Sequence, residues 1–131
     1  ILSSHHPLVF SRILSLDPSQ KLGIYLRADG WHWLRKTFYA SWVHPHFIYP
    51  ARELMNETIA CWVKSQSAKL IPCRINKEQE ILSALDLGAD GIISEYPTVL
   101  KEAYNKWKER DSTANQGEDN EPGTKHTSKI L

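Results

Sequence analysis

The sequence predicts an α/β protein in which short parallel strands alternate with helices. Short apolar runs are bounded by turn residues, most clearly at residues 22–26, and this pattern indicates strands that are buried on both faces. Between these runs apolar residues recur at helical spacing, which indicates amphipathic helices that cross from one parallel strand to the next. These patterns do not separate a (β/α) barrel from a doubly wound sheet, because both folds alternate strands and helices.

The first predicted strand ends within residues 1–4, and Pro7 suits the first turn of the helix that follows. An Asp-Pro-Ser turn at residues 17–19 should end this helix. Residues 22–26 form the second predicted strand. The aromatic-rich segment 27–46 shows neither the strand period nor the helix period, so we expect an irregular loop there.

The middle of the chain predicts an amphipathic helix over residues 51–66 and a strand over residues 70–75. Asn76 is predicted to cap the next helix, with Gln79 in the capping-box position. Gly88 stands where the end of that helix requires a left-handed residue.

The last predicted strand covers residues 91–94, and Pro97 suits the start of the last helix. We therefore expect one folded unit over residues 1–108. Residues 109–131 are almost all polar or charged, so they offer little apolar surface to offset the entropy of ordering them. The sequence predicts a disordered polar tail for this last segment.

Composition and charge limit the classes of partner. The 16 basic and 15 acidic residues give a formal net charge of +1, too small to attract nucleic acid or an anionic membrane. No apolar run reaches the roughly 20 residues of a membrane span, and no signal-peptide pattern opens the sequence. We expect no nucleic-acid partner, no transmembrane segment and a cytoplasmic location by default. Because the sequence starts at Ile1, an N-terminal signal could be missing.

Three motifs resemble those of one enzyme family. Residues 87–97, Leu-Gly-Ala-Asp-Gly-Ile-Ile-Ser-Glu-Tyr-Pro, resemble the closing motif of glycerophosphodiester phosphodiesterases, usually Leu-Gly-Val-Asp-Gly-Ile-Ile-Thr-Asp-Tyr-Pro. Residues 70–76 stand in the place of that family's Trp-Thr-Val-Asn strand end, and residues 1–4 and 16–18 are similar to its Ser-Ser-Phe strand end and Leu-Asp-Pro turn. The resemblance covers residues 1–108. It implies the C-terminal half of a (β/α)8 TIM barrel of the phospholipase C-like phosphodiesterase type.

The resemblance also implies where the substrate pocket lies. A (β/α) barrel carries its site at the carboxyl ends of its strands, so the pocket rim is expected at Ser4, Cys73, Arg74, Asn76 and Glu95. Departures from the family pattern fall in the same places, with Cys73 for Trp, Arg74 for Thr and Glu95 for Asp. His5 stands where the family has Phe, and it could face the same pocket. These departures leave open which substrate the chain would prefer.

Arg27 and Arg35 follow the second predicted strand. Their guanidinium groups could help to hold a phosphate at the mouth of the barrel, and the alternative, which is the default for both, is an ordinary exposed role. The partner implied by the resemblance is a small-molecule glycerophosphodiester. Strand edges that half a barrel leaves unpaired could also drive self-association.

The activity implied by the resemblance is hydrolysis of a glycerophosphodiester to an alcohol and glycerol 3-phosphate, with a divalent metal, Mg²⁺ or Ca²⁺, in the complete protein. The family takes its acid/base histidines and metal ligands from His-Arg-Gly, Glu-x-Asp and His-Asp motifs. This sequence has no His-Arg-Gly and no His-Asp, and its one Glu-x-Asp run, at residues 109–111, falls in the predicted tail.

We therefore expect the catalytic residues to lie upstream. On this expectation the chain contains no catalytic residue, binds no metal alone and is inactive alone. The alternative is a non-catalytic binding or regulatory module built on a degenerate barrel of the same family.

Overall fold

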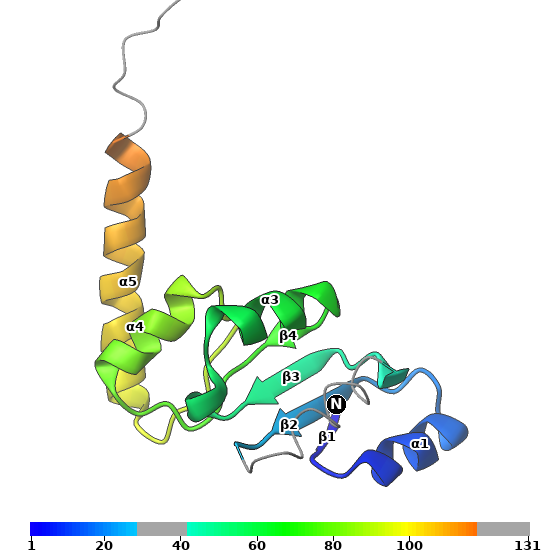
Figure 1. The fold of residues 1–131 in the computed structure, drawn as a ribbon. Helices are drawn as coiled ribbons and strands as arrows, with labels where there is room; N and C mark the ends of the chain where they lie inside the picture. Colours follow the sequence, from blue (N-terminus) through cyan, green and yellow to red (C-terminus); the bar gives the residue numbers. More distant parts are fainter. Residues whose placement is uncertain (29–41, 118–131) are drawn as a thin grey trace, which may run out of the picture.

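The computed structural model of the protein describes residues 1–28 and 42–117, which form a parallel sheet with helices packed beside it (Figure 1). In chain order the elements are β1 (Leu2–Ser4), α1 (Pro7–Leu16), β2 (Leu22–Leu26), β3 (Phe47–Pro50), the 3-10 turn η1 (Arg52–Leu54), α3 (Glu57–Ser65), β4 (Lys69–Leu70), α4 (Glu78–Asp86) and α5 (Pro97–Gly117). None of the described helices is long and apolar enough to cross a membrane.

The four strands form one sheet in the order β1-β2-β3-β4, and each neighbouring pair is parallel. Ile24 of β2 lies opposite Ile48 of β3, which in turn lies opposite Leu70 of β4. Beyond β4, single parallel bridges at Cys73 carry the pairing on to Ile93. The predicted strand over residues 91–94 is therefore present only as this one bridge.

The strand order decides between the two folds that the sequence left open. Within the described residues the order across the sheet follows the order along the chain, with no reversal. A doubly wound sheet reverses its strand order at a switch point, whereas a barrel adds each new strand beside the last. The structure therefore confirms a parallel α/β fold of the barrel type and excludes an independent doubly wound domain.

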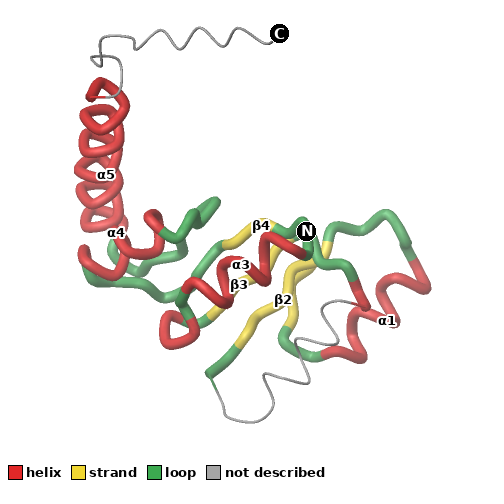
Figure 2. Tube along the Cα trace, turned by 45° about the horizontal axis from the view of Figure 1, so that its top comes forward, coloured by secondary structure: helices red, strands yellow, loops and turns green. Residues whose placement is uncertain are grey.

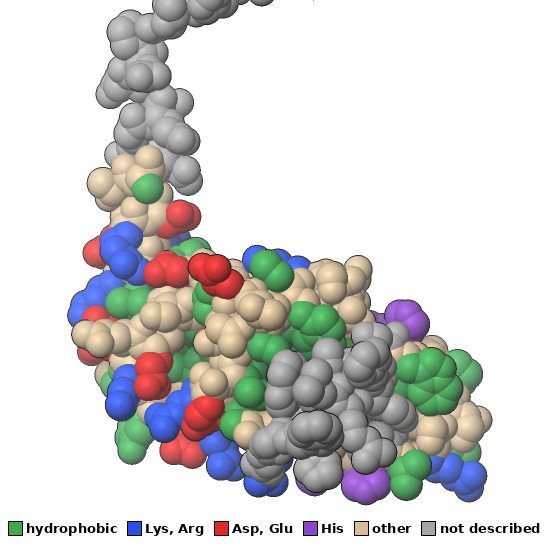
Figure 3. All heavy atoms as spheres, in the orientation of Figure 1, with side chains coloured by type: hydrophobic (Ala, Val, Ile, Leu, Met, Phe, Trp, Pro, Cys, Tyr) green, Lys and Arg blue, Asp and Glu red, His purple; other side chains and the backbone are tan. Residues whose placement is uncertain are grey.

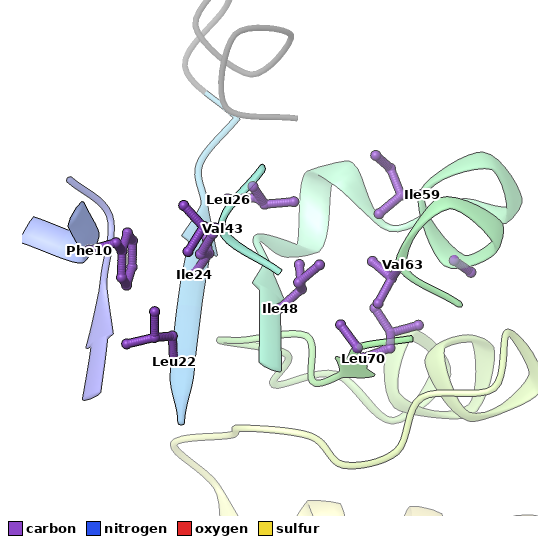
Figure 4. Packing of buried hydrophobic residues seen from close by; sticks show 11 residues of the cluster. Phe10, Leu22, Ile24, Leu26, Val43, Ile48, Ile59, Val63 and Leu70 are labelled. Carbon is purple, nitrogen blue, oxygen red and sulfur yellow. The ribbon is translucent and has the colours of Figure 1, made fainter. Parts of the chain in front are cut away.

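Helices α1 and α3 pack against one face of the sheet. Leu22, Ile24 and Leu26 alternate along β2, so their side chains point to the same face. Figure 4 shows them between Phe10 of α1 and the side chains of α3, and Figure 2 shows α3 lying along β3 and β4. This apolar cluster is the main core, and its buried members are Phe10, Leu22, Ile24, Leu26, Val43, Ile48, Ile59, Ala60, Val63, Ala68 and Leu70.

The opposite face of the sheet carries aromatic rings. The rings of Tyr25 and Tyr49 stack with centroids 4.7 Å apart, and Phe47 stacks on Tyr49 at 6.4 Å. Gly23 makes room for them, because a Cβ at this position would lie 2.5 Å from Tyr49 Cε2 and 2.7 Å from Ser3 Oγ. In a barrel this face, away from the helices, is the interior.

The Leu-Gly-Ala-Asp-Gly part of the closing motif ties α4 back to β4. Gly88 takes a left-handed backbone conformation with φ +82° after the helix, as the sequence predicts. The Asp90 carboxylate accepts the backbone N–H of Leu70 at 2.9 Å and pairs with Lys69 Nζ at 2.9 Å. Burial alone would raise the pKa of Asp90, but these two partners outweigh it and lower the pKa.

The last two helices form a smaller apolar cluster. Ile75, Ile81 and Ala84 are buried against Ala103 of α5. On the face drawn in Figure 3, side chains of both signs are interspersed over these helices. One such pair is Lys106 Nζ and Glu78 Oε1, 2.6 Å apart.

The structure corrects three predicted elements in the first part of the chain. Strand β3 was not predicted, and it lies between β2 and β4, which correspond to consecutive strands in the predicted order. The predicted helix over residues 51–66 begins as η1, and α3 starts only at Glu57 because Asn56 Oδ1 accepts the N–H of Ile59 at 2.9 Å. The predicted strand over residues 70–75 is reduced to Lys69–Leu70 and the bridges at Cys73.

Two further corrections concern α4 and α5. The residue that precedes α4 is Lys77, which makes no side-chain cap, so Asn76 does not form the predicted capping box. Helix α5 runs to Gly117, and residues 109–117 are thus helical where the sequence predicted the start of a disordered tail. Trp107 Nε1 donates a hydrogen bond to Asp86 of α4 at 2.9 Å, and the helix continues beyond this contact to Gly117. Residues 118–131 lie outside the described residues.

Candidate functional site

A cleft of about 650 Å³ opens at the carboxyl ends of the parallel strands. Each strand that borders it contributes residues from the segment directly after its end, because parallel strands bring their carboxyl ends to one edge of the sheet. The lining residues are His5, Tyr25, Arg27, Ala28, Ala51, Arg52, Glu53, Cys73, Arg74, Asn76 and Glu95.

Four of the five predicted rim residues line this cleft together: Cys73, Arg74, Asn76 and Glu95. Ser4 does not line it. Its hydroxyl instead accepts the backbone N–H of His6 at 3.1 Å, and His5 between them takes the place in the cleft. The structure thus brings together residues that the sequence placed at separate strand ends.

Asn76 links two of these strand ends. Its side-chain oxygen accepts hydrogen bonds from the backbone N–H of Glu95 at 3.0 Å and from the hydroxyl of Ser94 at 3.1 Å. Its amide Nδ2 donates to the Glu95 carboxylate at 3.3 Å. The last of these bonds holds the Glu95 carboxylate at the cleft, and the three together explain why Asn76 is not available to cap α4.

Arg74 has an unusual backbone conformation. Its φ is +63°, in the left-handed region that favours glycine. The N–H groups of Arg74 and Ile75 both donate to the carbonyl of Ile93, at 2.9 and 3.2 Å. Two residues thus face one partner residue, which is the arrangement of a β-bulge, and bulges next to binding sites redirect a side chain.

Arg52 and Glu53 form an exposed ion pair at the rim, with Nε and Oε1 3.0 Å apart. Arg52 Nη1 also lies 3.9 Å from Glu80 Oε1. The pKa of the Glu53 carboxyl is lowered, first by a hydrogen bond from its own backbone N–H and then by Arg52, so the group is ionised at neutral pH. Neither residue is free of a charged partner.

The thiol of Cys73 is half-buried in the cleft wall. Burial raises its pKa above the ordinary value for a thiol, and this outweighs the opposite influence of Arg74. The raised pKa favours the neutral thiol of Cys73, which is a poor nucleophile.

A metal site in the described part of the chain would need several ligating side chains close together. Across residues 1–28 and 42–117, no group of three or more His, Cys, Asp or Glu side chains is placed to hold an ion. Glu109 and Asp111, which form the Glu-x-Asp run, are exposed on α5 and do not line the cleft.

The sequence reasoning missed Arg52, Glu53 and Tyr25 as cleft residues. Arg52 and Glu53 were assigned to an outer helix, since β3 was not recognised and the segment after it was not seen as a strand end. The run Phe47-Ile48-Tyr49, whose residues favour strands, was the sequence signal that could have revealed β3. Arg27 lines the cleft, and Arg35 lies outside the described residues.

No family model and no curated protein matches this sequence. Solved structures do match the fold. A structure described as a glycerophosphoryl diester phosphodiesterase from Silicibacter pomeroyi aligns with a TM-score of 0.71 at 12% identity, covering 81% of this chain and 38% of its own.

Two other solved structures show the same relationship. A glycerophosphodiester phosphodiesterase structure from Galdieria sulphuraria aligns with a TM-score of 0.64 at 16% identity, covering 76% of this chain and 41% of its own. An Oleispira antarctica phosphodiesterase in complex with the product sn-glycerol-3-phosphate aligns with a TM-score of 0.64 at 18% identity, covering 79% and 40%.

These comparisons show which fold the chain has and how much of that fold it covers. The chain spans about two fifths of the length of the structures that it matches. At identities of 12–18% the likeness is one of fold. The chain therefore has the fold of part of the (β/α) barrel seen in solved glycerophosphodiester phosphodiesterase structures.

Proposed function

We propose that this chain is the C-terminal part of a glycerophosphodiester phosphodiesterase domain. In complete form this domain would hydrolyse a glycerophosphodiester to an alcohol and glycerol 3-phosphate with the aid of a divalent metal, Mg²⁺ or Ca²⁺. The cleft carries the proposal, because it lies at the carboxyl ends of the strands and is lined by residues of the closing motif and of the segment before α4.

The proposed role of this chain is to build one wall of the substrate pocket. Hydrolysis of a phosphodiester requires neutralisation of the phosphoryl charge and a proton donor for the leaving alcohol. Within the described residues no group of His, Cys, Asp or Glu side chains is placed to hold a metal ion. The metal ligands and the acid/base histidines would come from the other part of the barrel.

The test is reconstitution. The 131-residue chain is expressed alone and together with the segment that its gene encodes upstream of Ile1, and release of glycerol 3-phosphate from glycerophosphocholine is measured with added Mg²⁺ or Ca²⁺. We expect no turnover from either part alone and chelator-sensitive turnover from the two together. Turnover by this chain alone, or none by the assembled barrel, would contradict the proposal.

A non-catalytic binding or regulatory module is the second candidate. The observation that favours it is that His5, Cys73, Arg74 and Glu95, which depart from the family pattern, all line the cleft. An upstream coding sequence without the His-Arg-Gly and Glu-x-Asp motifs would decide for this candidate. An assembled barrel that binds glycerol 3-phosphate but hydrolyses no diester would do the same.

A further inference from the structure

The backbone at Arg74 does not by itself account for an arginine. At φ +63° a glycine would meet the geometry of the bulge without strain. The double hydrogen bond from Arg74 and Ile75 to the Ile93 carbonyl uses only backbone groups, so glycine would preserve it. What an arginine adds at this position is a long cationic side chain at the cleft.

The charges around Arg74 leave its guanidinium available. Arg52 is engaged by Glu53, and Glu95 is held by Asn76. Within the described part of the chain, Arg74 makes no ion pair and no side-chain hydrogen bond. The guanidinium group has five N–H donors in a fixed plane, a geometry that matches two oxygens of a phosphate.

The cleft as a whole favours an anion. Three arginines and two glutamates line it, namely Arg27, Arg52 and Arg74 against Glu53 and Glu95. The three arginines lie on the segments that follow β2, β3 and β4, so an anion in the cleft would be approached from several sides.

We propose that Arg74 binds the phosphate group of the ligand that enters this cleft, with Arg27 and Arg52 adding to the positive potential. The inference rests on the function proposed above and deepens it, because it names a residue of this chain that recognises the phosphoryl group. A phosphomonoester or inorganic phosphate carries about 1.5 to 2 negative charges at neutral pH, and a diester carries one. Monoesters therefore bind more tightly than diesters.

The experiment titrates the 131-residue chain by calorimetry with inorganic phosphate, sn-glycerol 3-phosphate and glycerophosphocholine at constant low ionic strength. We expect inorganic phosphate and sn-glycerol 3-phosphate to bind with higher affinity than glycerophosphocholine. Arg74→Gln should weaken binding of both dianions by about tenfold or more, since a charge-assisted hydrogen bond is lost. Arg12→Gln, the same change on α1 and away from the cleft, should leave affinity within about twofold.

Two further variants separate recognition from folding and from general charge. Arg74→Gly suits the left-handed backbone, so it should fold and yet bind phosphate as weakly as Arg74→Gln. Glu95→Gln removes a negative charge from the cleft and should tighten phosphate binding, roughly two- to threefold. The proposed site is refuted if the unmodified chain binds neither dianion, or if Arg12→Gln weakens binding as much as Arg74→Gln does. It is also refuted if Arg74→Gly retains full affinity for phosphate, or if Glu95→Gln weakens phosphate binding.

Failure of this inference and failure of the proposed function give different results. Phosphate binding that depends on Arg74, in an assembled barrel without turnover, would keep the anion site and overturn the hydrolase. The assembled barrel could instead turn over the diester while Arg74→Gln leaves phosphate binding unchanged. That result would support the proposed hydrolase function and overturn the anion site at Arg74.

Discussion

The side-chain oxygen of Asn76 accepts the backbone N–H of Glu95 at 3.0 Å, across 19 residues of sequence. With its bonds to Ser94 and to the Glu95 carboxylate, this side chain joins two strand ends that have only single bridges between them. Asn76→Ala should therefore lower the free energy of unfolding by about 1–2 kcal/mol, measured by urea denaturation.

The matched control for Asn76 is Gln79, the residue that the sequence paired with it in a capping box. The predicted box does not form, so Gln79→Ala should change the free energy of unfolding by less than about 0.5 kcal/mol. Equal losses from the two substitutions would show that Asn76 acts as a helix cap after all.

Arg74→Gly should stabilise the chain. A left-handed backbone conformation destabilises a residue with a Cβ by about 1–2 kcal/mol, and glycine removes this strain. Glycine also raises the conformational entropy of the unfolded chain, which offsets part of the gain. The net gain expected in thermal or urea unfolding is about 0.5–1 kcal/mol. Arg12→Gly, the same change inside α1, should destabilise by about 1 kcal/mol, and a loss at both positions would argue against strain at Arg74.

Gly23→Ala should destabilise the chain, because the new methyl group would lie 2.5 Å from the ring of Tyr49. Overpacking at such a site costs about 1–3 kcal/mol, measured as a shift of the urea midpoint. At Gly91 an added methyl group would meet Ile71 at an ordinary 3.8 Å, so Gly91→Ala should be neutral within about 0.5 kcal/mol. Equal effects at the two glycines would contradict the packing seen on the inner face.

The stability contributed by Asp90 should depend on pH. Its pKa is lowered in the folded chain, so its contribution is fully present above the unfolded pKa of about 4 and is lost as the pH falls through the folded pKa. Asp90→Asn should lower the free energy of unfolding by about 1–2 kcal/mol at pH 6, and this loss should be smaller at pH 3. Urea denaturation at both pH values tests this. The control is Asp111→Asn, an exposed change on α5, which should leave the free energy of unfolding unchanged at both pH values. A loss of stability from Asp90→Asn that is larger at pH 3 than at pH 6 would contradict the predicted sign.

Self-association through the strand edges is the fifth prediction. Within the described residues β1 pairs only with β2, and the bridge at Ile93 pairs only toward Cys73. Leu2 is 48% exposed and Ile93 41% exposed at these edges, where unpaired backbone groups can join another copy. The apparent mass in sedimentation should rise with concentration, and Leu2→Lys with Ile93→Lys should suppress the rise. Leu16→Lys at the end of α1 is the control, and equal suppression by it would point to association through exposed apolar side chains in general.

The helices show how far local sequence reaches. The helix over Glu78–Asp86 and the left-handed Gly88 that follows it were predicted from spacing and from residue type. Both depend on contacts within a few residues, which a single sequence displays directly. The prediction for the start of α5 at Pro97 is confirmed for the same reason.

The elements that were wrongly predicted depend on partners that are distant along the chain. Strand β3 is stabilised by β2 on one side and by β4 on the other, and its four residues are too few to show a period. Helix α5 continues through residues 109–117 after Trp107 docks on Asp86, although composition alone indicated disorder.

The sequence by itself determined the alternation of strands and helices, their parallel arrangement and the residue types at each strand end. Only the tertiary structure decided the strand order and brought Cys73, Arg74, Asn76 and Glu95 together in one cleft. It also decided that the Asn76 side chain bonds to Glu95 and does not cap the helix that follows it. The physical reason is that helix periods and caps are local, while a hydrogen bond or a bulge between two strands forms only when the fold brings both of them together.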